Sequence, residues 1–193
     1  PSSFTIYVGL DCEASELGIS EATNFICTST DMDYAYARFR QLDTSDDMLL
    51  VTCYDLVDPS FSPPGCAQVV IVDLKYSEPW ESVPPQQYYQ TKFEYAEILL
   101  SRVDALYPGF REHIEEIEIA TPITHMRYLG HPGGAIYGFD QYAKESSLFS
   151  SPRSPVQGLY LAGAWAGSGG FQPTLNSGVQ AARAVIRELG RVE

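Results

Sequence analysis

The feature that most constrains this chain is a glycine-rich stretch near its end, AGAWAGSGGFQPTLNSG at residues 162–178. Before it lies a short apolar run, GLYLAGA at 158–164, and after it a segment with helical spacing from Pro173 to Leu189. A helix that is entered from a glycine loop presents unpaired amides and the positive end of its dipole. Four glycines form the loop: Gly163, Gly167, Gly169 and Gly170. The stretch predicts a strand, a loop and a helix that either bind a ligand or form only a tight connection.

The helix expected from Pro173 has its own signals. Proline suits the first turn, where its missing N–H costs nothing, and Gly178 would allow close approach to a neighbouring strand or cofactor. Its apolar residues share one face: Leu175, Val179, Ala182, Ile186 and Leu189.

The first part of the chain is typical of a sheet. Apolar residues alternate in residues 4–10, and further β-rich runs follow as NFICTS, MLLVTCY and AQVVIVDL. We expect several of them to pair in one sheet. A short helix is expected in DMDYAYARFRQL with Asp31 as its cap, and DPSFSPPG at 58–65 predicts a turn that returns the chain into the last run.

From Pro85 the apolar spacing becomes helical, and Pro108 and Gly109 end the pattern. The expected core face consists of Tyr89, Phe93, Ala96, Leu100, Val103 and Tyr107. The following segment, IEEIEIATPITHMRYLG, alternates as a strand that continues through Pro122 into GHPGGAIYG, with its carboxylates facing solvent. Residues 144–157 predict a polar connector. We place a domain boundary at Pro122, giving domains 1–121 and 122–193.

Composition excludes several function classes. A net charge of −13 with scattered Lys and Arg argues against nucleic-acid binding. No run reaches the roughly 20 apolar residues of a membrane span, so we expect a cytoplasmic chain for which peripheral membrane contact stays open. The cysteines lack zinc-site spacing and are expected to be buried free thiols in a reducing compartment: Cys12, Cys27, Cys53 and Cys66.

Metal and hydrolytic sites are not expected. The histidines, His113, His125 and His131, have no metal-ligand spacing and are interpreted as hydrogen-bonded polar side chains. Ser168 lacks the G-x-S-x-G elbow and an identifiable His partner.

Beyond spacing, SPVQGLYLAGAWAGSGGFQPTLNSGVQAARAVI resembles the C-terminal FAD-contacting segment of the phytoene desaturase, carotenoid isomerase and retinol saturase group within the flavin amine oxidase superfamily. DPSFSPPG, the tyrosine-rich helix that ends in LYPGF, and TPITHMRYLGHPGGAIYG resemble that group in the same order. The resemblance therefore covers nearly the whole chain. It implies a mixed α/β (α+β) fold, the C-terminal part of a two-domain flavoprotein. Residues 1–121 would be part of a substrate domain with a mixed sheet, and 122–193 would complete the FAD-binding domain with its closing strand and helix.

The resemblance also implies site residues. Those that would contact FAD are Gly163, Ala164, Trp165, Gly170, Phe171, Gln172, Gly133 and Gly134. The amides near Gly170 to Gln172 would point at the pyrimidine edge of the ring. Substrate would contact Tyr137, His131 and, if it carries a carboxylate, Arg127. One departure is that Ala164 and Trp165 stand where many relatives carry an acidic residue, and no side chain is assigned as a catalytic acid or base.

The G-x-G-x-x-G turn that holds the pyrophosphate in this family has no counterpart in the 193 residues. We therefore expect the chain to be the C-terminal portion or a subunit of a longer FAD-dependent oxidoreductase, with a partner polypeptide that supplies the dinucleotide fold. Desaturation, saturation or isomerisation of a lipophilic, polyene-like substrate is the first interpretation. An amine or amino-acid oxidase and a non-catalytic structural subunit are the alternatives.

Overall fold

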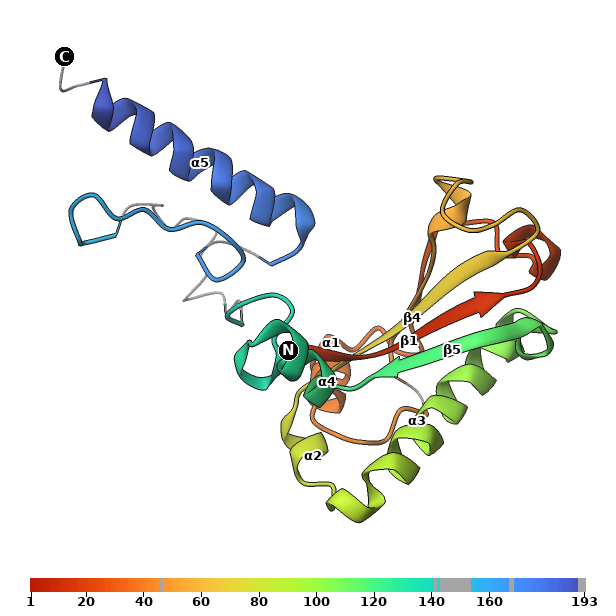
Figure 1. Cartoon of the computed structure of the whole chain (residues 1–193). Coiled ribbons are helices and arrows are strands. Elements are labelled where there is room, and N and C mark those ends of the chain that lie inside the picture. Colours follow the sequence, from red (N-terminus) through yellow and green to blue (C-terminus); the bar gives the residue numbers. More distant parts are fainter. Residues whose placement is uncertain (46, 141, 143–153, 167–168, 191–193) are drawn as a thin grey trace. The chain divides into compact units, whose positions relative to one another are not determined.

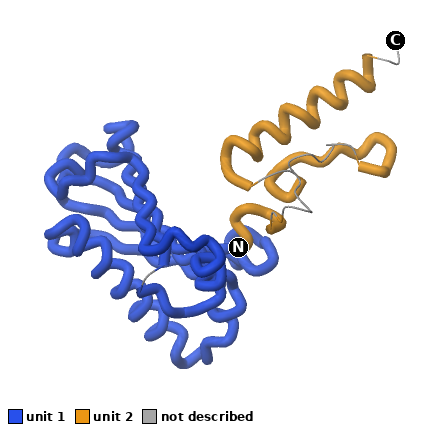
Figure 2. Tube along the Cα trace, turned by 180° about the vertical axis from the view of Figure 1, so that it is seen from behind, with its two compact units in different colours: residues 1–134 blue, residues 135–193 orange. Residues whose placement is uncertain are grey.

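A computed structural model of the chain describes all residues except 46, 141, 143–153, 167–168 and 191–193. It forms two compact units, residues 1–134 and 135–193 (Figure 2). The division falls after Gly134, whereas the predicted functional boundary lies at Pro122. The assignment of substrate and flavin roles to the two parts remains a prediction.

Unit 1 is built on a five-stranded sheet in the order β2-β3-β4-β1-β5. All neighbouring strands are antiparallel, and β1 runs through the sheet beside β4 and β5 (Figure 1). The strands are β1 (Ser2–Leu10), β2 (Thr23–Ile26), β3 (Leu49–Cys53), β4 (Ala67–Lys75) and β5 (Ile114–Ala120). The predicted pairing of the early β-rich runs is confirmed.

Alternation along β1 places one set of side chains in the core, as the sequence predicts. Phe4, Ile6, Val8 and Leu10 are at most 2% exposed, because every second side chain of a strand points to the same face. The same face of β4 contributes Val69 and Ile71. The helix α3 (Pro85–Leu106) covers this face (Figure 1) and closes the core.

The predicted helix from Pro85 is confirmed, but its predicted core face is partly wrong. Tyr89 is 71% exposed and Phe93 is 37% exposed, whereas Tyr95 and Leu99 are buried. The predicted Ala96, Leu100 and Val103 are buried, and Tyr95 and Leu99, one position before the first two, complete the buried face. Tyr95 is held there by Phe4 and Trp80, whose ring centroids lie 4.4 and 5.3 Å from its own.

The helix α1 (Met32–Arg38) begins at the cap that the sequence predicts. The Asp31 carboxylate accepts hydrogen bonds from the amides of Asp33 and Tyr34, both at 3.0 Å. These bonds satisfy two of the amides that a helix start leaves unpaired.

A buried ionic cluster joins the end of α1, the following loop and β4. Lys75 is fully buried and its Nζ donates to Asp47 Oδ2 at 2.5 Å and to the Arg38 carbonyl at 2.9 Å. Arg38 Nε donates to the other oxygen of Asp47 at 2.7 Å. Each buried charge thus meets an opposite charge, which a low-dielectric interior requires.

Asp73 completes this cluster from the same strand. Its Oδ2 accepts hydrogen bonds from Thr44 Oγ1 at 2.7 Å and from Tyr95 Oη at 2.5 Å, while Lys75 Nζ lies 3.9 Å away. Its Oδ1 has no hydrogen-bond partner among the described residues. Burial raises the pKa of Asp73 to about 6, because desolvation outweighs the attraction of Lys75.

The strand expected to run through Pro122 is wrong beyond Ala120. A helix, α4 (Pro122–Leu129), follows β5 instead. Thr121 caps it through a capping box with Thr124, Pro122 occupies the first turn, and Gly130 ends it in the left-handed conformation at φ +68°. Proline at the start and glycine at the end are the helix signals that the alternating pattern obscured.

Short helical turns connect the main elements. They are η1 (Ala14–Leu17), η2 (Tyr54–Leu56), α2 (Glu78–Glu81), η3 (Phe110–His113) and η4 (Pro132–Gly134). In β5 the exposed carboxylates Glu115, Glu116 and Glu118 confirm the predicted solvent face. A shift of register against β1 lies between Gly9 and Leu10, which pair with Glu116 and Ile114.

Unit 2 contains α5 (Phe171–Leu189), which begins two residues before the predicted start. The expected strand at 158–164 is wrong: the structure has only a single bridge residue there, Tyr160. A strand needs a hydrogen-bonded neighbour, and none runs beside this segment among the described residues. The predicted apolar face of α5 is exposed, with Leu175 and Ile186 both 67% accessible. Most of the expected connector at 144–157 lies outside the described residues.

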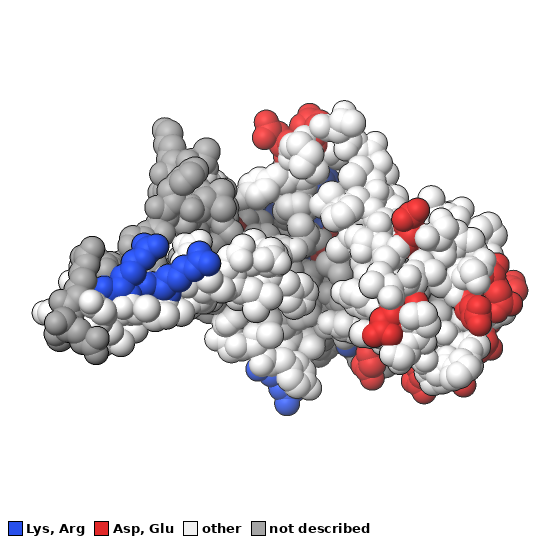
Figure 3. Space-filling view, turned by 90° about the horizontal axis from the view of Figure 1, so that it is seen from above, with Lys and Arg blue, Asp and Glu red and all other residues white. Residues whose placement is uncertain are grey.

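The described part of the chain has the expected mixed α/β fold, but its sheet is antiparallel and not the mixed sheet that the resemblance implies. All four cysteines are free thiols, but the prediction that all are buried is wrong for Cys27, which is exposed, and Cys66, which is half-buried. No described helix is long and apolar enough to cross a membrane. Acidic side chains stand at several separate points of unit 1, and a small basic group lies on α5 (Figure 3).

Asp73→Asn is expected to change how stability depends on pH. Because the pKa of Asp73 is raised in the folded state, the stability linked to its proton is complete below pH 4 and is lost as pH rises through about 6. Asparagine cannot lose this proton. Urea unfolding of the variant and the wild-type chain should show the variant gaining about 1 to 3 kcal/mol relative to wild type between pH 4 and pH 7.

Asp58→Asn serves as the control, because hydrogen bonds from Ser60 lower the pKa of this exposed carboxyl. Its stability difference should not shift in the same direction. An Asp73→Asn difference that stays constant across this pH range would contradict the raised pKa.

Candidate functional site

The glycine loop of unit 2 begins with a tight turn at Gly163. Its carbonyl accepts a hydrogen bond from the Ala166 amide at 3.1 Å, and its φ is +105°, a conformation that favours glycine. Ala164 and Trp165 lie within this turn. Gly167 and Ser168, the middle of the predicted loop, lie outside the described residues.

Ser177 ties this turn to the first part of α5. Its Oγ accepts a hydrogen bond from the Gly163 amide at 2.7 Å and donates to the Thr174 carbonyl, also at 2.7 Å. These hydrogen bonds hold the Gly163 turn beside the first part of α5. Sequence reasoning missed Ser177, because a serine inside a predicted helix gives no signal for a partner 14 residues away.

The segment at 135–140 packs directly on the glycine loop. A Cβ on Gly138, whose φ is +77°, would lie 2.5 Å from the Ala164 carbonyl oxygen, and a Cβ on Gly169 would lie 2.4 Å from the Tyr137 Cβ. Phe139 adds an edge-to-face contact with Trp165, with ring centroids 4.8 Å apart. The end of the first glycine-rich stretch, at Tyr137 and Gly138, therefore meets the second stretch, at Ala164 and Gly169, at backbone distance within unit 2.

The helix α5 starts with its amides uncovered by side chains. Gly170 is the N-cap at φ +102° and contributes no side-chain hydrogen bond. Pro173 has no N–H, and the Thr174 amide donates to the Gly170 carbonyl, so Phe171 and Gln172 supply the N–H groups of the first turn. Phe171 is 92% exposed. This end of α5 can donate to an electron-rich group and adds the positive end of the helix dipole.

The remaining predicted contacts lie in unit 1, around the end of α4. Gly134 is required there by packing, since a Cβ would lie 2.3 Å from the Pro122 carbonyl oxygen. Gly133 has a φ of +59° and lies against Ser77. His131 is half-buried beside them, and Arg127 is exposed with its guanidinium 5.8 Å from the Tyr128 ring. Packing explains the two glycines, and contact of this group with flavin or substrate stays a prediction.

The interpretation of His125 as a hydrogen-bonded polar side chain is confirmed. Its Nε2 lies 3.2 Å from Ser3 Oγ and 3.4 Å from Thr5 Oγ1, and burial lowers its pKa. Through this contact α4 covers the start of β1 on the sheet face opposite to α3.

A shallow cavity of about 390 Å³ lies farther along β1, near the end of the sheet. Sequence reasoning missed it, because its walls come from separate parts of the chain: Tyr7, Phe61, Pro63, Cys66, Gln68, Glu116, Ile117 and Glu118 among others. Its aromatic and aliphatic walls can contact an apolar molecule, while three glutamates, Glu115, Glu116 and Glu118, leave one side polar.

The family profile of flavin-containing amine oxidoreductases matches residues 37–186. The chain belongs to this family. Because the match spans both compact units, it confirms the resemblance identified from the glycine-rich stretches and the expectation that the cofactor is a flavin, FAD.

Three relatives show which proteins this chain is similar to. All-trans-retinol 13,14-reductase of Danio rerio is 25% identical over 180 residues, which is 84% of this chain and 30% of that protein. Pyridine nucleotide-disulfide oxidoreductase domain-containing protein 2 of Mus musculus is 34% identical over 69% of the chain and 24% of its own length. The chloroplastic prolycopene isomerase of Arabidopsis thaliana is 28% identical over 79% of the chain and 26% of its own length.

The chain therefore spans less than a third of the length of these relatives. Two of these relatives are named for reactions of retinol and prolycopene. The described residues fit a flavin in one respect that the structure itself provides: Gly170 leaves the start of α5 without a side-chain cap, beside the amides of Phe171 and Gln172.

Gly138→Ala is expected to loosen the glycine turn, and Gly158→Ala provides a matched control. Both glycines have a φ of +77°, but a Cβ on Gly158 meets no atom within 4 Å, whereas one on Gly138 meets the backbone of Ala164. Both variants carry about 1 kcal/mol of backbone strain. Only Gly138→Ala adds overpacking, so hydrogen exchange of the Ala166 amide should accelerate roughly tenfold more in this variant. Equal exchange in both variants would show that the contact with Ala164 is not maintained.

Proposed function

We propose that this chain is the C-terminal portion or a subunit of an FAD-dependent oxidoreductase that acts on a lipophilic, polyene substrate by desaturation, saturation or isomerisation. The observation that carries the proposal is the meeting of the two glycine-rich segments beside the open start of α5, in a chain of a flavin-containing family. Retinol and prolycopene, in the names of two relatives, are both polyenes, which supports this substrate class.

The bound flavin would supply the redox chemistry by accepting or donating a hydride. The role of this chain is then to position the ring. The Gly163 turn and Gly170 allow the ring to approach the backbone, and the amides of Phe171 and Gln172 would donate to its pyrimidine edge. Such donors stabilise negative charge on the ring. Ala164 and Trp165 offer no carboxylate for the ribityl chain, so that contact would come from elsewhere.

The exposed apolar face of α5 supports the expectation of further polypeptide. Leu175, Val179 and Ile186 are 48% to 67% exposed along one side of the helix, and burial of such side chains is worth about 1.5–3 kcal/mol each. A polypeptide with the dinucleotide-binding fold would cover this face and hold the adenosine end of FAD.

The first test uses the assembled protein, isolated from its natural source through an affinity tag on this chain. Its absorption spectrum should show a flavin, and denaturation should release FAD. Chromatography should then detect conversion of all-trans-retinol or prolycopene. Peroxide release with amines instead would favour an amine oxidase, and a colourless assembly would leave only a structural subunit.

Phe171→Pro tests the amide contact directly. Proline is tolerated in the first turn of a helix, so this change removes one N–H and keeps the start of α5. Phe171→Ala is the matched control, because it removes the same exposed side chain and keeps the amide. Loss of a hydrogen bond to a charged group costs about 1.5–3 kcal/mol, so the flavin potential of the proline variant should fall by about 30–60 mV relative to the alanine variant. Equal potentials would exclude this contact.

A further inference from the structure

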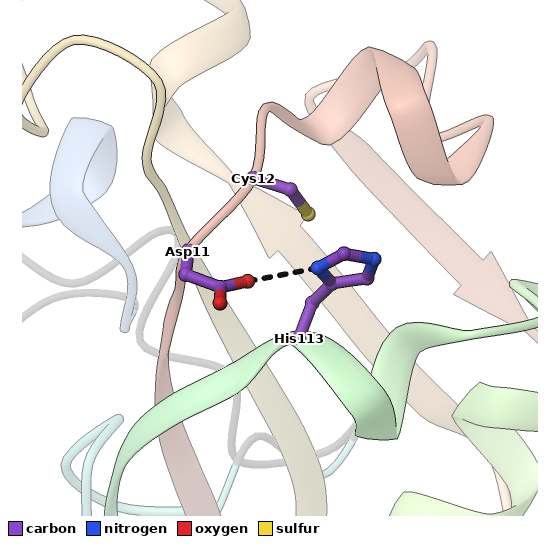
Figure 4. Close-up of side chains that lie close together, drawn as sticks. All are labelled: Asp11, Cys12 and His113. Carbon is purple, nitrogen blue, oxygen red and sulfur yellow. Dashed lines mark hydrogen bonds and ion pairs between the residues drawn. The ribbon is translucent and has the colours of Figure 1, made fainter.

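Three side chains of different chemistry meet where β1 ends and β5 begins. They are Asp11 and Cys12, which directly follow β1, and His113, which directly precedes β5. One ligand atom from each, a carboxylate oxygen, a thiol sulfur and a ring nitrogen, lies within 4.8 Å of the other two. Figure 4 shows the carboxylate and the thiol converging on the same edge of the imidazole ring. We propose that Asp11, Cys12 and His113 form a binding site for a Zn²⁺ ion.

The backbone fixes this arrangement before any ion binds. The Asp11 amide donates to the His113 carbonyl at 3.1 Å, and His113 Nδ1 lies 2.8 Å from Asp11 Oδ1. The register shift between β1 and β5 lies immediately beside the site, where Leu10 pairs with Ile114. Such irregularities often re-aim side chains at functional sites. The two segments, 102 residues apart in sequence, are therefore held together at this point.

The chemistry of the three groups suits zinc. Thiolate, imidazole and carboxylate are the ligands that Zn²⁺ takes in proteins, and the combination of thiolate with imidazole disfavours Mg²⁺ and Ca²⁺. Zinc–ligand bonds of about 2.0–2.3 Å require ligand atoms roughly 3.3–3.8 Å apart. Side-chain rotations that move the atoms by about 1 Å achieve this from the observed separations. Binding would release the thiol proton to solvent. It would also replace the contact between His113 Nδ1 and Asp11 by bonds from both groups to zinc, with the imidazole proton moved to Nε2.

The surroundings leave one side of the site open. Cys12 is 4% exposed and belongs to the core, whereas the side chains of His113 and Asp11 are 42% and 58% exposed. An ion would thus be anchored from the core side by sulfur and would keep a fourth position toward solvent, where a water molecule can complete a tetrahedron. Glu16, in the turn that follows Cys12, adds negative charge nearby.

The site lies outside the glycine-rich loop and does not depend on the proposed flavin function. Zinc binding would join the end of β1 to the start of β5, and its expected consequence is greater stability of unit 1. Sequence spacing gave no sign of it, because two of the ligands are adjacent and the third, at the end of η3, lies 102 residues after Asp11.

The test titrates the full chain of 193 residues, kept reduced, with Co²⁺ as a spectroscopic substitute for Zn²⁺. One equivalent should produce a sulfur-to-cobalt charge-transfer band, which Zn²⁺ then displaces. Cys12→Ser and His113→Gln each remove a direct ligand. Loss of a group that only contacts a ligand typically lowers metal affinity by about 10–100-fold, so each variant should weaken binding by at least about 100-fold. Zn²⁺ should also raise the melting temperature of the wild-type chain but not of these variants.

Cys27→Ser and His131→Gln are the matched controls, because they change an exposed thiol and a histidine elsewhere in the chain. Both should retain the band. Since His113 is partly exposed, His113→Gln remains informative even if Cys12→Ser disturbs the core, and circular dichroism checks that each variant is folded. Absence of the band, or a band that survives His113→Gln or is lost in Cys27→Ser, would overturn the proposal.

Discussion

Unit 1 depends on the pairing of Lys75 with Asp47 in the interior. A fully buried ammonium group is costly unless it is paired and hydrogen-bonded, and this one receives both a carboxylate and a backbone carbonyl. The same Asp47 holds Arg38, and its carbonyl accepts a hydrogen bond from Arg102 on α3 at 2.5 Å. One carboxylate residue thereby connects β4, α1 and α3, three elements that share no neighbouring sequence. The sheet and its covering helix keep their mutual position through this residue as well as through apolar contact.

The sequence was most informative where a local rule acts alone. Alternation identified the buried face of β1, and Asp31 was recognised as a cap because its hydrogen bonds reach only two and three residues ahead. Prediction failed where a longer-range partner decides. Tyr89 and Tyr95 are equally compatible with a helix core, and only the positions of Phe4 and Trp80 select Tyr95. At α4 the cause is different: Thr121, Pro122 and Gly130 are local helix signals, but they lie within an alternating pattern that also fits a strand.

The candidate site was partly predictable for a similar reason. Glycine is needed where two main-chain segments pack closely, so such positions can be recognised in the sequence. The two glycine-rich stretches identified the segments that meet at Gly138 and Ala164. That they meet each other, and that Ser177 fastens the turn, depends on tertiary packing that no spacing encodes. The contact of Asp11 with His113 could not be predicted at all. An exposed acid and a histidine 102 residues apart do not indicate a shared site until the fold brings the ends of two strands together.

The placement of β1 has a consequence for how the protein is made. In the finished sheet β1 is flanked by β4 and β5, and β5 ends at Ala120. Pairing across so long a separation is slow, because the chain between must first be ordered. During synthesis, Phe4 therefore stays in contact with water until its packing partners Trp80 and Tyr95 have emerged, and the β5 edge of β1 stays unpaired for longer. We expect that newborn chains at this stage are the form that chaperones encounter most.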